Sequence, residues 1–66
     1  MAVLKVLELM SSSEKSWEDA SRIAVAKASE TVKNIKSVWV KEQSMSVKDG
    51  NISEFRVTLK VTFEIN

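Results

Sequence analysis

The chain has 66 residues, of which ten are basic, nine are acidic and 44% are hydrophobic. This length is enough for one domain, residues 1–66, and so small a domain is marginally stable unless disulfides, a structural metal or partner subunits reinforce it. Because the sequence contains no Cys and no His, it excludes disulfides, thiolate zinc sites and the commonest transition-metal ligand. We therefore expect a homo-oligomer.

Charge and hydropathy exclude further classes of protein. The formal net charge is +1 and the two signs are mixed along the chain, which argues against a nucleic-acid-binding arm or a polybasic membrane-binding segment. No window approaches the apolar length that spans a bilayer, and the first residues lack the pattern of a secretory signal. We expect a cytoplasmic protein that binds neither nucleic acid nor membranes.

The first half of the chain predicts one strand and one helix. Residues 3–10 are rich in Val and Leu, which favours a short strand. Ser16, followed three residues later by Asp19, resembles a capping box at the start of a helix. The apolar residues that follow recur every three or four positions and predict a helix over residues 16–34. Trp17 begins this apolar stripe, and we expect it to anchor the first helical turn onto a sheet.

The second half of the chain predicts a β-hairpin. From residue 36 onward the side chains alternate with period two, and two strand-like segments, residues 36–47 and 52–65, flank Asp49 and Gly50. An Asp-Gly pair between such segments is typical of a tight type I′ turn, because both of its central residues need positive φ. This turn fixes the register of the two strands.

The predicted register gives the hairpin two different faces. One face is nearly all apolar and is expected to meet the helix. This face consists of Val38, Val40, Phe55, Val57, Leu59, Val61, Phe63 and Ile65. The other face places Trp39 opposite Lys60, and Gln43 opposite Arg56. A single helix covers only one side of a sheet, so we expect Trp39 to point away from the core of its own subunit.

Trp39, Gln43 and Arg56 are the candidate functional residues that this register yields. An exposed Trp is suited first to a contact between subunits, then to a cation–π contact with Lys60 or Arg56, and then to stacking on a flat ligand. Gln43 and Arg56 lie close together in this register and are suited to hold a planar group or a phosphate. Arg56 is equally suited to a salt bridge between subunits.

Catalysis and metal binding find little support in the sequence. The absence of His and Cys removes the commonest general base and the strongest nucleophile, and a single glycine excludes a glycine-rich phosphate loop. Four acidic residues of the hairpin could ligate a hard cation at an oligomer axis, namely Glu42, Asp49, Glu54 and Glu64. Without calcium-loop spacing they fit a solvated face better. We expect a protein that is not an enzyme, and the sequence singles out no metal ligand.

The order of strand, serine-rich turn, helix and two long strands resembles the dodecins, which are small flavin-binding proteins. The resemblance is carried by residues 5–9, 16–18, 42–47 and 55–63, and it extends over essentially the whole chain. It implies an α+β fold in which a three-stranded antiparallel sheet wraps around one helix. It also implies that twelve β-α-β-β subunits assemble into a hollow homo-dodecamer.

The same resemblance implies a ligand site and two candidate cofactors. Dodecins stack a Trp near the start of the second strand on the flavin ring, and a Gln of the third strand bonds the edge of that ring. The corresponding positions here hold Ser37 and Arg56, and Trp39 lies two residues further along the same face. The pattern of residues 42–47 with Arg56 is similar to a branch of the family described as calcium-associated. The candidates are therefore a flavin (FMN or riboflavin) and calcium.

We predict a non-catalytic, dodecin-like oligomeric shell that binds and stores or sequesters a flavin or a similar flat cofactor. The predicted cofactor-binding residues are Ser37, Trp39, Gln43 and Arg56. The alternative is a structural or ion-binding assembly of the same kind that has lost flavin binding, because Ser37 and Arg56 replace the Trp and the Gln that the resemblance leads us to expect.

Overall fold

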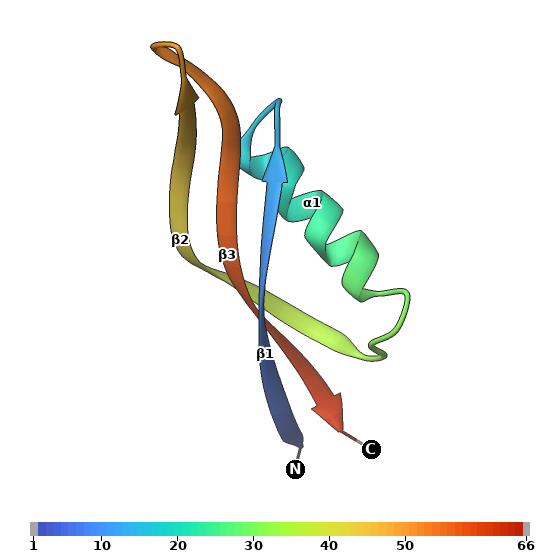
Figure 1. Ribbon diagram of the computed structural model, residues 1–66. Coiled ribbons are helices and arrows are strands. Elements are labelled where there is room, and N and C mark those ends of the chain that lie inside the picture. Colours follow the sequence, from blue (N-terminus) through green and yellow to red (C-terminus); the bar gives the residue numbers. More distant parts are fainter. Residues whose placement is uncertain (1, 66) are drawn as a thin grey trace.

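The computed structural model describes residues 2–65, which form one helix and three strands in the order β-α-β-β. The elements are β1 (Val3–Ser13), α1 (Trp17–Ala28), β2 (Ile35–Lys48) and β3 (Asn51–Ile65). The strands form one antiparallel sheet in the order β1-β3-β2, and Figure 1 shows α1 lying along one side of it. The predicted α+β architecture is confirmed.

The helix α1 begins where the sequence predicts and ends earlier. The hydroxyl of Ser16 accepts a hydrogen bond of 2.9 Å from the backbone N–H of Asp19, which caps the first turn. The last helical residue is Ala28, so the predicted end at residue 34 was wrong. The backbone N–H of Val32 still donates to the carbonyl of Ala28. Asn34 then adopts a left-handed conformation, with φ of 62°, which ends any helical path and leads the chain into β2.

The first strand extends three residues beyond its predicted end at Met10. Residues 11–13 continue the antiparallel ladder opposite residues 55–57 of β3, so the serine run does not end the strand. The hydroxyl of Ser13, which is buried, donates a hydrogen bond of 2.6 Å to the carboxylate of Asp19. The serine-rich segment therefore joins the end of β1 tightly to the start of α1.

The hydrophobic core lies between α1 and the central strand β3, and it is small. Its buried apolar residues are Ala20, Ala24, Ala28, Val57, Leu59 and Val61. Because alanine has a short side chain, the helix lies close to the sheet but buries less apolar area than a helix with leucine at these positions would. A narrow helix also leaves space on either side of itself above the sheet.

Trp17 fastens the first turn of α1 to the hairpin. Its ring packs edge to face on Phe55, with ring centroids 5.2 Å apart and ring planes at 76°. Its indole N–H donates a hydrogen bond of 3.0 Å to the backbone carbonyl of Ser44 in β2. These two contacts confirm the prediction that Trp17 anchors the helix onto the sheet.

The turn between β2 and β3 has the predicted geometry. Asp49 and Gly50 have φ angles of 52° and 78°, as the central residues of a type I′ turn require. Lys48 and Asn51 flank the turn as a cross-strand pair, which confirms the predicted start of the register. In Figure 1 this turn projects beyond the helix at the end of the molecule remote from both termini.

Candidate ligand-binding and subunit-contact face

The side of the sheet opposite α1, here called the open face, is covered by no element of residues 2–65 (Figure 1). The open face consists of Leu4, Val6, Glu8, Met10 and Ser12 of β1, Arg56, Thr58, Lys60 and Thr62 of β3, and Ser37, Trp39, Glu42 and Ser44 of β2. Four large apolar residues on it, Leu4, Val6, Met10 and Trp39, are more than half exposed. Such an accumulation of exposed apolar side chains on one face is typical of an interaction surface.

Trp39 stands at one end of a row of side chains that crosses all three strands. It pairs with Lys60 of β3, which pairs in turn with Glu8 of β1. The Nζ of Lys60 lies over the indole, 5.7 Å from the ring centroid, a cation–π contact of about 0.5–1 kcal/mol at an exposed site. The carboxylate of Glu8 forms an ion pair of 3.3 Å with Lys41. The predicted contact between Trp39 and Lys60 is thus confirmed.

Gln43 does not lie on the open face, contrary to the prediction that placed it opposite Arg56. It pairs with the buried Val57 and therefore shares the helix side of the sheet, whereas Ser44 pairs with Arg56. The other three predicted site residues remain on the open face, as the same pairing shows. The structure therefore removes the amide from the candidate site and leaves Trp39 and Arg56 on one surface.

The cause of this error is a β-bulge at Lys41. The strand register shifts by one residue between Val40 and Glu42, and one inserted residue reverses the face that each following side chain occupies. A second irregularity between Ser46 and Val47 restores the register that the turn sets. The available sequence signal was the pair Lys41 and Glu42, two consecutive charged residues that interrupt the alternation of the strand.

Arg56 has a partner that the sequence analysis missed. Its Nε donates a hydrogen bond of 3.2 Å to the hydroxyl of Ser12, the residue directly opposite it in β1. Among residues 2–65 no carboxylate forms an ion pair with Arg56, so its terminal nitrogens are available for a two-point contact with a phosphate or carboxylate. Ser12 was missed because β1 was predicted to stop at Met10.

Ser37 is exposed and lies opposite Thr62, two residues before Trp39 in β2. Its hydroxyl can donate and accept hydrogen bonds but offers no ring on which a ligand could stack. Trp39 is therefore the aromatic plane of the open face, with Ser37 beside it along the same strand and the Arg56 guanidinium further along β3.

Two other classes of site were sought in residues 2–65. No group of three or more acidic side chains in this range lies close enough to share one metal ion. The helix α1 has 12 residues, and no helix of the described chain has the length and apolar character that a membrane-crossing segment needs.

The fold and the open face together define a class of small β-α-β-β subunits whose sheet leaves one side to partners or ligands. The family model described as Dodecin matches residues 3–66. The chain belongs to the dodecin family.

Individual relatives support this assignment over nearly the whole chain. The calcium dodecin of Mycobacterium tuberculosis is 35% identical over 65 residues, covering 98% of this chain and 92% of its own, and its crystal structure superposes with a TM-score of 0.84. The dodecin of Thermus thermophilus is 32% identical over 63 residues, covering 96% of this chain and 91% of its own. The structure of an arginine-to-alanine variant of a T. thermophilus dodecin gives a TM-score of 0.94 at 30% identity, covering 100% of this chain and 98% of that one.

Proposed function

We propose that the chain is a non-catalytic subunit of a cytoplasmic homo-dodecameric shell that holds a flat cofactor of the flavin type, such as FMN or riboflavin, on its open face. The observation that carries this proposal is Trp39, which is 66% exposed on a sheet side that α1 leaves uncovered, in a chain of the dodecin family. An indole plane attracts a second ring system by offset stacking. Burial between subunits would exclude water from the stacked ring and shield it.

The open face offers the groups that such a cofactor needs. Trp39 supplies the stacking plane, and the terminal nitrogens of Arg56 can hold a carbonyl edge or a phosphate. Ser37 and Ser12 supply hydroxyl groups beside these two residues. Gln43 has no part in this site because it lies on the helix side. The bound flavin would bring its own redox and photochemistry, and the residues of this chain would only bind it and exclude water.

A flavin fluorescence titration of the purified protein tests the proposal. We expect the fluorescence of FMN or riboflavin to be quenched at micromolar protein concentration. Trp39→Ala should weaken binding at least about fivefold, since stacking on an aromatic side chain contributes about 1–3 kcal/mol. Val47→Ala, at an exposed apolar position near the turn, is the matched control and should bind as the unchanged protein does. Flavin that stays fluorescent at these concentrations contradicts the proposal.

A structural or ion-binding shell is the second candidate function. The observation that favours it is the relative named calcium dodecin, which is 35% identical to this chain. Because no cluster of three acidic residues occurs within residues 2–65, a calcium site with three or more carboxylates would need side chains from more than one subunit. Thermal unfolding in calcium and in chelator tests this candidate, and an equal midpoint in both removes the ion from it.

A further inference from the structure

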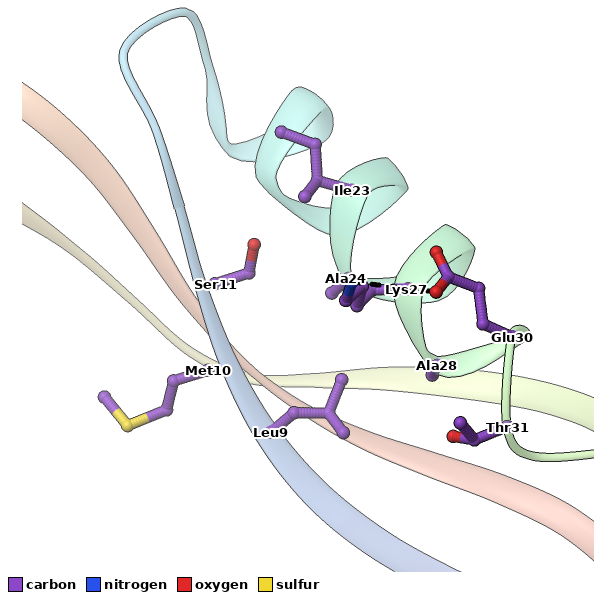
Figure 2. A pocket seen from close by; sticks show the side chains of 9 residues that line it. All are labelled: Leu9, Met10, Ser11, Ile23, Ala24, Lys27, Ala28, Glu30 and Thr31. Atoms are coloured by element: carbon purple, nitrogen blue, oxygen red, sulfur yellow. Dashed lines mark ion pairs between the residues drawn. The ribbon is translucent and has the colours of Figure 1, made fainter.

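Ser12, Arg56 and Ser44 form one row of side chains across the three strands, here called the Arg56 row. Arg56 of β3 pairs with Ser12 of β1 on one side and with Ser44 of β2 on the other. Figure 2 shows the alternation of β1 at this point, where Ser11 points toward α1 and Met10 points away from it. Ser12 follows in the same alternation and shares the side of Met10. The row therefore places two hydroxyl groups and one guanidinium together on the open face.

The guanidinium of Arg56 is held at one nitrogen by its own subunit. Its Nε donates a hydrogen bond of 3.2 Å to the hydroxyl of Ser12, which directs the side chain toward β1. Among residues 2–65 no carboxylate lies within ion-pair distance of it. Its two terminal nitrogens can therefore donate in parallel to two oxygens of one anion. The hydroxyl of Ser44, on the other side of Arg56, is a further donor.

The Arg56 row lies well away from the stacking plane of Trp39. Trp39 pairs with Lys60, which is four residues along β3 from Arg56, and at about 3.3 Å per residue the separation is about 13 Å. The bond to Ser12 also draws the guanidinium toward β1, whereas Trp39 belongs to β2 on the far side of β3. A ring system centred on the indole does not bring its own edge to this guanidinium. The group that meets Arg56 has to be carried at the end of a flexible tail.

The charges around the Arg56 row restrict the kind of anion that it can hold. Glu42 pairs with Thr58, the next residue of β3 on this side, and Glu54 lies two positions before Arg56 on the same side. Both carboxylates repel an anion, so a ligand has to gain more than one contact in return. A phosphate monoester has a charge of about −1.5 to −2 and three acceptor oxygens. It can take both terminal nitrogens and still accept from a serine hydroxyl, whereas a carboxylate has only two oxygens.

We infer that the Arg56 row is the phosphate subsite of the open face, and that the site selects phosphorylated flavins such as FMN over unphosphorylated riboflavin. The ring stacks on Trp39 and the sugar-alcohol tail runs along β3 to the row. Ser12 is a positioning residue, because it acts by directing the guanidinium of Arg56. The inference rests on the proposed flavin-type ligand and names the form of that ligand.

The ratio of the dissociation constants for riboflavin and FMN, measured by quenching of flavin fluorescence, tests the inference. The unchanged protein should bind FMN at least about tenfold more tightly than riboflavin. Arg56→Gln should lower this preference to about twofold or less, because riboflavin has no phosphate contact to lose. Ser12→Ala should lower the preference about threefold, and Ser12→Thr, which keeps the hydroxyl, should retain it. Lys5→Gln is the matched control, because it removes one positive charge from the other side of the sheet.

The outcomes separate this inference from the proposed function. Equal binding of riboflavin and FMN by the unchanged protein overturns the inference and leaves the proposed function standing, whereas no quenching of either flavin contradicts both. A preference that survives Arg56→Gln, or that Lys60→Gln or Lys5→Gln removes as fully, also overturns the inference. If Arg56→Gln binds neither flavin, Glu42→Gln decides. Removing this carboxylate should raise the preference for FMN about twofold, and an unchanged preference overturns the inference.

Discussion

The two tryptophans of this chain stand in opposite surroundings, and the contrast separates what holds the subunit together from what it offers to others. Trp17 packs on Phe55 and donates a hydrogen bond to the carbonyl of Ser44. Trp39 lies on the open face, 66% exposed, with the ammonium of Lys60 above its ring. Trp17 makes its ring contact and its hydrogen bond within its own chain. Most of the ring surface of Trp39 is exposed and available to a partner or ligand.

The same contrast holds for the two sides of the sheet as a whole. On the helix side Val57, Leu59 and Val61 are buried against alanines of α1. This core buries little apolar area, so the loss of one large side chain removes a substantial part of it. The open face carries charged and apolar groups whose contacts with one another are single and exposed. A change on the helix side should therefore alter the stability of the subunit, and a change on the open face should alter association or binding.

Leu59→Ala should produce the largest loss of stability in the subunit. Leu59 is fully buried at the centre of the core, and truncating a buried leucine costs about 2–5 kcal/mol. Chemical denaturation at a fixed protein concentration measures the change. Val6→Ala, at a position 53% exposed on the open face, is the matched control and should cost less than about 1 kcal/mol. Equal losses in the two variants would show that both sides of the sheet are packed alike.

Deleting Lys41 should have the next largest effect, because it removes the bulge. Glu42 would then follow Val40 in regular alternation, so residues 42–46 would keep their faces. The strand β2 would lose the local bend and twist of the bulge, which should displace the Ser44 carbonyl that Trp17 holds. We expect a loss of about 1–3 kcal/mol, within the usual range for a structural change of this kind. Lys41→Ala keeps the inserted residue and loses only the ion pair with Glu8, so it should change stability by about 0.2–1 kcal/mol. A deletion as stable as Lys41→Ala would mean that the bulge has no structural role.

Trp17→Phe should cost about 1 kcal/mol of subunit stability. The substitution keeps an aromatic ring against Phe55 but removes the indole N–H that bonds to Ser44, and one hydrogen bond contributes about 0.5–1.5 kcal/mol. Trp39→Phe, its matched control, should leave the stability of the subunit within about 0.5 kcal/mol of its original value. Denaturant midpoints at equal protein concentration make the comparison, and a larger loss from Trp39→Phe would contradict the division between the two sides.

The sequence was enough for most of the fold because each signal was local. Asp49 and Gly50 set the turn by their positive φ, Ser16 and Asp19 set the helix start, and the apolar alternation near Leu59 set the buried side of β3. These features depend on backbone sterics and on burial within a few residues of the chain. The end of α1 was harder to predict, because residues 29–34 contain no Gly or Pro to stop a helix and Val32 continues the apolar spacing past Ala28.

The candidate site was predicted less well because it depends on contacts between distant segments. Arg56 donates a hydrogen bond to Ser12, 44 positions away. Ser12 belongs to the part of β1 that was not predicted, because the serine run was taken as the end of the strand. Gln43 left the site because a single bulge at Lys41 reversed the alternation, and a bulge is set by how a long strand curves around its helix. Only its trace, two consecutive charged residues, is visible in the sequence.

Glu8→Gln, on the open face, should cause the smallest loss of subunit stability among these substitutions. It breaks the ion pair with Lys41, whose two side chains are 44–47% exposed, so the loss should be about 0.2–1 kcal/mol at low salt. The difference should vanish near 1 M salt, where the Debye length is about 3 Å. Glu14→Gln, at an exposed carboxylate with no ion pair among residues 2–65, is the control. A loss above about 2 kcal/mol that persists in high salt would show that the open face contributes to the stability of the subunit as the core does.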